Sequence, residues 1–314
     1  MIMVEEKKTK IDLAENLLRQ RKYKKAITVL KNLHKNYPEE ESILFMLSLA
    51  YYDDGDTKQA EKYLNVLLER ELKRKVFTGF AFDELVRIYK QEKDFVKLVE
   101  ICEKVVFAQP EDVGLLTELG SAYLQSGKAK ETCDIYERLI SMESDNPVFY
   151  CLWGEALFAA GLIKESEKAF IKAGEFDSEQ SDYYFFKNAF LFQQAQKHED
   201  AERLLNKCIS VNSSNPLYYC SLGDSFISMG KIQNALEAYD RAIQYDNSRA
   251  ASYYNRLGNS LMKTGNFSQA VDAFQSAIKY EPVWHYYSNL ASAYRGMGLT
   301  EQAEMIMCEL NKIR

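Results

Sequence analysis

The sequence contains few of the residues that catalysis and metal binding need. Its 314 residues include only three histidines, which lie far apart and without the spacing of metal ligands: His34, His198 and His285. No HExxH motif, nucleophile elbow or phosphate-binding glycine loop occurs. The carboxylates are plentiful, but nothing distinguishes a catalytic pair from a solvated helix surface. We therefore expect no catalytic residues, no cofactor and no metal ion.

Cysteine pairs and long apolar runs are also absent. The six cysteines stand singly, without a CxxC motif: Cys102, Cys133, Cys151, Cys208, Cys220 and Cys308. Residues 1–10 lack the apolar segment of a signal peptide, and no run approaches the roughly 18 apolar residues of a membrane helix. These absences predict a cytoplasmic protein without disulfides and without membrane insertion.

An excess of positive charge is missing as well. The formal net charge is −6 and the isoelectric point is about 5.4, whereas nucleic-acid binding needs clustered basic residues. Residues 1–112 carry 21 basic and 21 acidic side chains, so the whole negative excess lies beyond them. We therefore expect no nucleic-acid partner, and a basic or neutral protein partner for the C-terminal two-thirds of the chain.

What the sequence does contain is a repeat. All five prolines, Pro38, Pro110, Pro147, Pro216 and Pro282, fall at one phase of a period of roughly 34 residues. Nine units start 33 to 38 residues apart, at Lys7, Glu41, Gly79, Val113, Pro147, Asp182, Pro216, Ala251 and Trp284. No linker rich in Ser, Gly or Pro interrupts them. We therefore expect one continuous domain over residues 1–314.

Within each unit, the apolar and small residues fall on two helical faces. Positions 4, 7, 8 and 11 of a unit share one face of a first helix, and positions 20, 24 and 27 share one face of a second. Position 11 is always Leu, Tyr or Phe, and position 20 is alanine in six units. Helical hairpins of this kind bury their apolar faces only against their neighbours, so the pattern predicts a solenoid.

This pattern resembles the tetratricopeptide repeat (TPR). The eighth unit matches that family best, through Tyr254, Leu257, Gly258, Gly265, Ala270, Phe274, Ala277 and Pro282. The resemblance covers residues 7–314 and implies an all-α fold. That fold is a right-handed α-solenoid, or superhelix, of about nine helix-turn-helix units with roughly eighteen antiparallel helices. The resemblance also implies that the first helices line a concave groove, in which positions 2, 5, 9 and 12 face a bound peptide.

The third unit departs from the family pattern. Its position 8 is Val86 and its position 20 is Leu98, both larger than the residues usual there. The unit also follows a spacing of 38 residues, four more than the common period. We therefore expect an irregularity near residues 70–100, with altered curvature between the second and third units.

The groove positions of units five to seven form an apolar trough that contains two carboxylates. Aromatic side chains dominate interface hot spots, because they bury a large area with few torsions to freeze. We expect an amphipathic partner segment with apolar anchors and a Lys or Arg between them. The expected partner-binding residues are Val148, Cys151, Glu155, Phe158, Tyr183, Phe186, Phe190, Leu217, Asp224 and Ile227, with Gln193 and Cys220 at the remaining positions.

The alternative is that neighbouring first helices bury these residues against one another without any ligand. A second such face in unit two, made by Phe45, Leu49 and Tyr52, is expected to serve packing. Two special grooves of the family are not expected. The carboxylate clamp for acidic C-terminal tails needs Lys where Asn255 stands, and Asn289 is only one rung of an asparagine ladder.

Three functional classes follow from these observations. The first is a non-catalytic scaffold or adaptor that binds a peptide or helical segment of a partner protein in the concave groove. The second is a TPR regulatory or docking segment of a larger enzyme or of a secretion or assembly machine. The third is an RNA-binding helical repeat, which the acidic balance disfavours.

The last second helix carries an apolar face, formed by Ile306, Met307, Leu310 and Ile313. Repeat arrays usually end in a polar capping helix that covers such a face. We therefore expect this edge either to dock onto another molecule, for example a second copy of the chain, or to belong to a longer protein.

Overall fold

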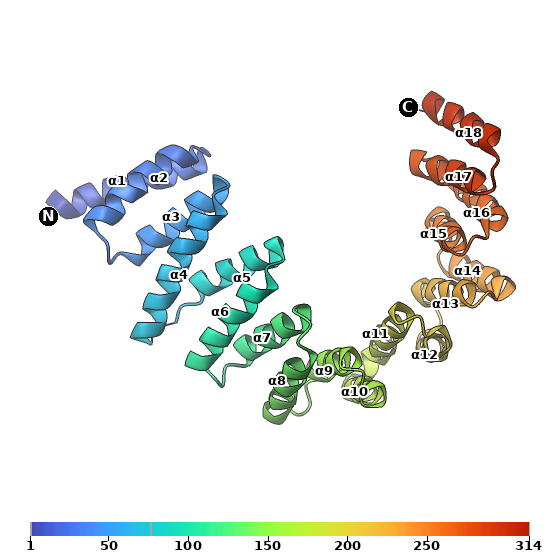
Figure 1. Ribbon diagram of the computed structural model, residues 1–314, viewed down its shortest axis with the longest axis horizontal. Coiled ribbons are helices and arrows are strands. Elements are labelled where there is room, and N and C mark those ends of the chain that lie inside the picture. Colours follow the sequence, from blue (N-terminus) through green and yellow to red (C-terminus); the bar gives the residue numbers. More distant parts are fainter. Residues whose placement is uncertain (1, 76, 314) are drawn as a thin grey trace. The chain divides into compact units, whose positions relative to one another are not determined.

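The fold consists of helical hairpins repeated along the chain. The computed structural model describes residues 2–75 and 77–313, and it describes side chains within residues 6–308. All regular structure in the described residues is helical, with eighteen α-helices and two short 3-10 helices (Figure 1). This confirms the prediction of an all-α fold with roughly eighteen helices in helix-turn-helix units.

Each hairpin pairs a first helix with a second. The first helices are α1 (Ile2–Arg19), α3 (Glu41–Asp53), α5 (Phe80–Glu92), α7 (Val113–Gln125), α9 (Pro147–Ala159), α11 (Ser181–Gln194), α13 (Pro216–Ser228), α15 (Ala250–Lys263) and α17 (Trp284–Gly296). The second helices are α2 (Tyr23–Asn36), α4 (Thr57–Arg74), α6 (Phe95–Ala108), α8 (Ala129–Met142), α10 (Ile163–Phe176), α12 (His198–Val211), α14 (Ile232–Tyr245), α16 (Phe267–Tyr280) and α18 (Thr300–Ile313). The 3-10 helices are η1 (Ser178–Gln180) and η2 (Asn247–Arg249).

The hairpins group into two compact units. The N-terminal unit comprises residues 1–139 and the C-terminal unit comprises residues 140–314, so the division falls within α8. Each unit has its own buried core, in which alanines at position 20 such as Ala60 and Ala235 are fully buried. That residues 1–314 form one continuous solenoid stays a prediction.

The long spacing before the third repeat extends one helix of the N-terminal unit. Helix α4 has 18 residues, whereas α2 and α6 have 14 each. Four residues are about one turn of α-helix. The helix ends at Arg74, and the next residue, Lys75, has a φ of +55°. The four extra residues therefore lengthen the second helix of repeat two, and the expected change of curvature stays a prediction.

Glycine at position 8 makes room for an aromatic ring in the same repeat. A Cβ atom on Gly258 would lie 2.5 Å from the ring of Phe274, and one on Gly223 would lie 2.7 Å from the ring of Tyr239. Both rings belong to position 24 of the second helix and are buried. The small residue at position 8 therefore faces mainly position 24, rather than the alanine at position 20.

Prolines and asparagines fix where two of the first helices begin. Pro147 and Pro216 stand at the first positions of α9 and α13, where a missing N–H is harmless. Asn146 and Asn215 precede them, and each side chain accepts a hydrogen bond from a backbone N–H two residues on. These caps fix where α9 and α13 begin, and with them the positions of the side chains along the first helices.

The cysteines are unpaired, and the last helix carries part of the apolar face expected for it. All six cysteines are free, and five of them are buried, Cys308 being exposed. Ile306 and Met307 on α18 are half-buried. The side chains of Leu310 and Ile313 lie outside the described residues, so self-association through this edge stays a prediction.

Candidate functional site

A groove lies along the first helices of three consecutive repeats in the C-terminal unit. It is formed by α11, α13 and α15, together with the turns that follow α11 and α15 and the first residue of α12. Its volume is about 840 Å³. Its lining residues are Phe186, Lys187, Phe190, Gln193, Gln194, Gln196, His198, Leu217, Ser221, Asp224, Ser228, Arg256, Ser260, Lys263 and Thr264.

Three apolar side chains are open to this groove. Phe190 on α11 is 46% exposed and Leu217 on α13 is 43% exposed. Phe186 is half-buried, and its ring centroid lies 5.2 Å from that of Tyr218. The neighbouring residue Phe192 is buried and anchors α11 in the core. A partner can therefore cover Phe190 and Leu217 while the core beneath them stays intact.

Asp224 on α13 is the centre of a polar network beside these apolar side chains. Its Oδ2 accepts hydrogen bonds from Arg256 Nη2 at 2.7 Å and from Arg256 Nε at 2.9 Å. Its Oδ1 accepts hydrogen bonds from the hydroxyls of Tyr239 at 2.6 Å and Ser260 at 2.5 Å. Four hydrogen bonds from three residues thus occupy both oxygens of this carboxylate.

The network holds its members in fixed protonation states. Burial lowers the pKa of Arg256, but the charge of Asp224, the neighbouring Tyr239 and the hydrogen bonds to Asp224 together outweigh it, and the net pKa is raised. Burial, followed by the Asp224 charge, raises the pKa of Tyr239 well above its usual value. Arg256 is therefore a permanent cation, and the Tyr239 hydroxyl remains a hydrogen-bond donor.

A second ion pair links α9 to α11. Lys187 Nζ lies 2.7 Å from Glu155 Oε1. Burial lowers the pKa of Lys187, but the hydrogen bond and the charge of Glu155 outweigh it, and the net pKa is raised. In both pairs the carboxylate precedes its cation by 32 residues, from position 9 of one repeat to position 6 of the next. That recurring spacing is the sequence signal that could have identified Lys187 and Arg256, which sequence reasoning missed.

The turn after α11 and the first residue of α12 each add one polar side chain to the groove. Gln196 has a φ of +59°, at the position where most repeats of this unit have glycine. His198 Nε2 lies 3.1 Å from Gln196 Oε1, whereas His198 Nδ1 is buried without a hydrogen-bond partner among the described residues. Burial lowers the pKa of His198, so its imidazole is neutral near pH 7.

The structure brings only some of the expected partner-binding residues to this groove. Phe186, Phe190, Leu217 and Asp224 line it, as does Gln193, whose amide donates to the Ser221 carbonyl at 2.7 Å. The other expected residues lie elsewhere in the unit. Val148 and Tyr183 are exposed outside the lining, Cys151, Cys220 and Ile227 are buried, Glu155 binds Lys187, and Phe158 packs on Phe192 with ring centroids 5.2 Å apart.

Comparisons with known proteins agree with this architecture. The sequence model of the tetratricopeptide repeat family matches residues 11–72, 220–279 and 255–304. The crystal structure of a tetratricopeptide repeat protein from Parabacteroides merdae aligns with a TM-score of 0.52 at 17% identity, over 81% of this chain and 98% of that one. The chain belongs to the tetratricopeptide repeat family. The groove therefore lies along the first helices of three TPR hairpins.

Two relatives show how far the likeness in sequence extends. A TPR repeat-containing protein of Methanocaldococcus jannaschii is 22% identical over 253 residues, which cover 75% of this chain and 44% of the relative. Tetratricopeptide repeat protein 17 of Mus musculus is 40% identical over 47 residues, or 15% of this chain and 4% of the relative. This TPR chain thus spans less than half the length of either relative.

The N-terminal unit has a smaller cavity beside α3 and α5. It has a volume of about 300 Å³, and its lining includes Phe45, Phe80 and Ala81. The ring centroids of Phe45 and Phe80 are 6.0 Å apart, and Phe80 is 65% exposed. Tyr52 lies under the guanidinium of Arg87, 4.1 Å from the ring centroid to Cζ, and Leu49 is half-buried. Phe45 and Tyr52 thus make contacts with the next TPR.

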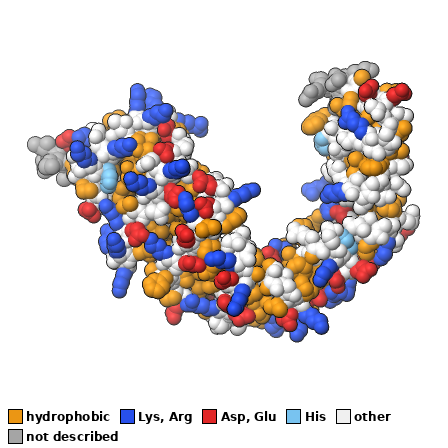
Figure 2. Space-filling model, viewed as in Figure 1, with side chains coloured by type: hydrophobic (Ala, Val, Ile, Leu, Met, Phe, Trp, Pro, Cys, Tyr) orange, Lys and Arg blue, Asp and Glu red, His pale blue; other side chains and the backbone are white. Residues whose placement is uncertain are grey.

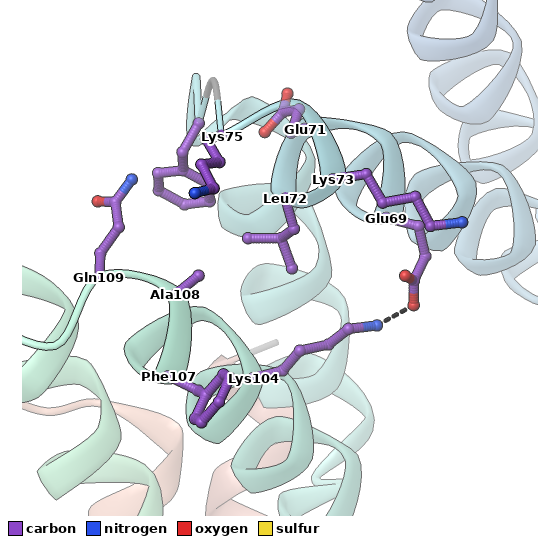
Figure 3. Close-up of a pocket in the computed structure, with 10 residues that line it drawn as sticks. Glu69, Glu71, Leu72, Lys73, Lys75, Lys104, Phe107, Ala108 and Gln109 are labelled. Carbon is purple, nitrogen blue, oxygen red and sulfur yellow. Dashed lines mark hydrogen bonds and ion pairs between the residues drawn. The ribbon is translucent and has the colours of Figure 1, made fainter.

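A second cavity of the N-terminal unit lies between the second helices α4 and α6 (Figure 3). Its volume is about 510 Å³, and Lys104 is paired with Glu69 at its edge. Phe107 at the end of α6 is 90% exposed. Figure 2 shows acidic and basic side chains interspersed over the visible face of this unit. The cavity is therefore a mixed surface without a dominant charge.

Within residues 2–75 and 77–313, no helix is both long enough and apolar enough to cross a bilayer. In the same part of the chain, no three His, Cys, Asp or Glu residues are grouped in a way that could hold a metal ion.

Proposed function

We propose that this TPR protein is a non-catalytic interaction scaffold that holds a peptide or a short helical segment of a partner protein in the groove along α11, α13 and α15. The supporting observation is that Phe190 and Leu217, both nearly half exposed, open into one cavity of about 840 Å³. Ligand-binding pockets commonly have volumes of about 300 to 1,000 Å³, and this groove combines three apolar side chains with polar groups that are partly fixed by the network around Asp224.

The apolar side chains supply the affinity in this proposal. Covering a Phe or Leu side chain that is half exposed removes apolar surface from water, and a well-packed aromatic anchor contributes on the order of 2 kcal/mol. The polar network around Asp224 supplies rigidity, because Arg256 and Tyr239 already satisfy the carboxylate. The groove therefore pays little conformational entropy when a segment binds.

A peptide selection tests this proposal directly. Random twelve-residue peptides, embedded between Gly-Ser spacers on a display particle, are selected on the whole chain and on two variants. Phe190→Glu places a charge on the exposed apolar anchor, and we expect it to abolish enrichment. Val211→Glu is the matched control, because Val211 is 49% exposed but lies at the end of α12, outside the groove.

The control decides what a loss of binding means. We expect Val211→Glu to enrich the same peptides as the unaltered chain, and both variants to keep the helical circular dichroism and the melting temperature. Equal enrichment on Phe190→Glu and on the unaltered chain would refute the groove as the binding site. Unfolding of Phe190→Glu would show that the residue belongs to the core instead.

A second role, as the TPR docking segment of a larger protein, is supported by the comparison of lengths. The chain spans 44% of its archaeal relative and 4% of the mouse protein. The test is the length of the transcribed open reading frame around this sequence in its source organism. A reading frame of 314 codons would remove this second role.

A further inference from the structure

The sign of the charge on the partner follows from which groups of the groove are already paired. The sequence alone suggested a basic partner, attracted by Glu155 and Asp224. In the structure, Glu155 is bound by Lys187 and both oxygens of Asp224 are occupied by Arg256, Tyr239 and Ser260. Asp224 is the sole carboxylate of the lining. The described groove therefore offers no unpaired carboxylate to an incoming Lys or Arg.

The unpaired charge of the groove is positive. Lys263, the last residue of α15, lines the cavity and is exposed. Its ammonium group has no ion pair or hydrogen bond within the described residues. The carbonyl end of α15 offsets at most about half a charge. His198 adds no charge near pH 7, because burial lowers its pKa. One net positive charge therefore remains in the cavity that Phe190 and Leu217 also line, although the chain as a whole carries −6.

We infer that the groove selects an acidic, not a basic, partner segment. This inference rests on the proposed function. The segment places an aliphatic or aromatic side chain against Phe190 and Leu217, and an Asp or Glu side chain against Lys263. The carboxylate belongs to a side chain within the segment, so no free C-terminus is needed.

A basic segment meets two costs in the same place. Its cation has to displace Arg256 from Asp224, or Lys187 from Glu155, which leaves a partly buried protein cation without its partner. It also has to approach Lys263, and like charges repel. An acidic segment meets neither cost, since it gains an ion pair and leaves the network around Asp224 intact.

The same peptide selection tests this inference through the composition of the enriched clones. We expect an excess of Asp and Glu over Lys and Arg, together with at least one large apolar residue. A selected peptide is then synthesised with blocked termini, and its affinity is measured by fluorescence anisotropy. We expect Lys263→Glu to weaken binding about tenfold, since it replaces an attraction by a repulsion. We expect Lys263→Arg to bind within about twofold of the unaltered chain.

The control for net charge is Lys279→Glu, an exposed lysine on α16 outside the groove. It changes the charge of the chain equally, and we expect it to leave the affinity within about twofold. Enriched peptides that are basic or neutral, or equal losses for Lys263→Glu and Lys279→Glu, would overturn the inference. The proposed function would survive both results if Phe190→Glu still abolished binding. If no peptide is enriched above the Phe190→Glu background, the proposed function and the inference fall together.

Discussion

The two units differ in most of the residue pairs at positions 8 and 24 of a repeat, although the N-terminal unit also has one glycine–aromatic pair, Gly120 and Tyr136, and the C-terminal unit has one alanine–leucine pair, Ala189 and Leu205. In the N-terminal unit, positions 8 and 24 of the first three repeats combine Ala, Ser or Val with a non-aromatic residue, in the pairs Ala14 and Leu30, Ser48 and Leu64, and Val86 and Cys102. In the C-terminal unit, three repeats combine glycine with an aromatic residue, in the pairs Gly154 and Phe170, Gly223 and Tyr239, and Gly258 and Phe274. All twelve residues of these six pairs are buried. A larger side chain on one helix is thus matched by a smaller one on the other.

The third repeat follows the same rule of matched volumes. Val86 is large for position 8, but Cys102 at position 24 is small, and both are buried. Interiors are packed to nearly constant density, so the sum of the two volumes matters more than either residue. The third repeat therefore keeps the volume of its core pair, and its distinctive feature is the longer helix α4 that precedes it.

The largest loss of stability is expected from truncating the buried side chain at position 24 to alanine. Phe274→Ala in the C-terminal unit should cost about 4 kcal/mol, and Leu64→Ala in the N-terminal unit about 3 kcal/mol, because both side chains are almost fully buried and the larger one leaves the larger cavity. Amide hydrogen exchange followed by mass spectrometry measures the loss of protection in each unit separately. Equal loss of protection in both units for either variant would contradict the independence of the two cores.

Filling the space beside an aromatic ring should have a smaller effect. Gly258→Ala puts a methyl group 2.5 Å from the ring of Phe274, which forces the ring to move. We expect a loss of about 1 to 2 kcal/mol, since alanine recovers part of the cost through its higher helix propensity. Chemical denaturation measures this change.

The control for this substitution is in the N-terminal unit. Ser48→Ala keeps the size of position 8 and removes a hydroxyl that bonds only to the Phe45 carbonyl of its own helix, so we expect a change of about 0.5 kcal/mol or less. The double variant Gly258→Ala with Phe274→Leu should lose less than the sum of its single changes, because leucine leaves room for the new methyl group. If the free-energy changes of the two single variants add up to that of the double variant, the residues at 258 and 274 are not matched in volume.

The fold could be predicted from the sequence because the same positions recur in nine repeats. One apolar residue at position 11 indicates little, but nine in register leave few alternatives to a helical array. The residue that the glycine at position 8 faces could not be predicted in the same way, however. Sequence periodicity shows that Gly258 lies on the inner face of its helix, but the ring of Phe274 reaches it only through the crossing of the two helices.

The groove could be predicted only in part, for a related reason. Position 5 is Cys151 and Cys220 in repeats five and seven, and both are buried, whereas Phe186 in repeat six is half-buried and reaches the groove. One position can therefore be core or surface, depending on the size of its residue. The pairing of Asp224 with Arg256 depends on the register of adjacent first helices, which a count within one repeat does not contain.

The smallest effect on stability is expected from the titration of one histidine in each unit. His34 on α2 and His198 on α12 each have a buried Nδ1 without a hydrogen-bond partner among the described residues. Burial lowers the pKa of both, and the nearby charge of Arg70 lowers that of His34 further. Both imidazoles should therefore titrate below the usual value near 6.5, and His34 should feel the added effect of a neighbouring cation.

The sign of the pH dependence follows from these directions. A histidine whose folded pKa is depressed binds fewer protons than the unfolded chain below about pH 6.5, so each unit should lose stability as the pH falls through that range. Proton NMR titration of the two imidazoles measures their pKa values. Arg70→Gln should raise the pKa of His34 and leave that of His198 unchanged, because Arg70 perturbs His34 alone of the two. A pKa above 6.5 for either histidine would contradict its burial, and equal shifts of both in Arg70→Gln would contradict the local origin of the effect.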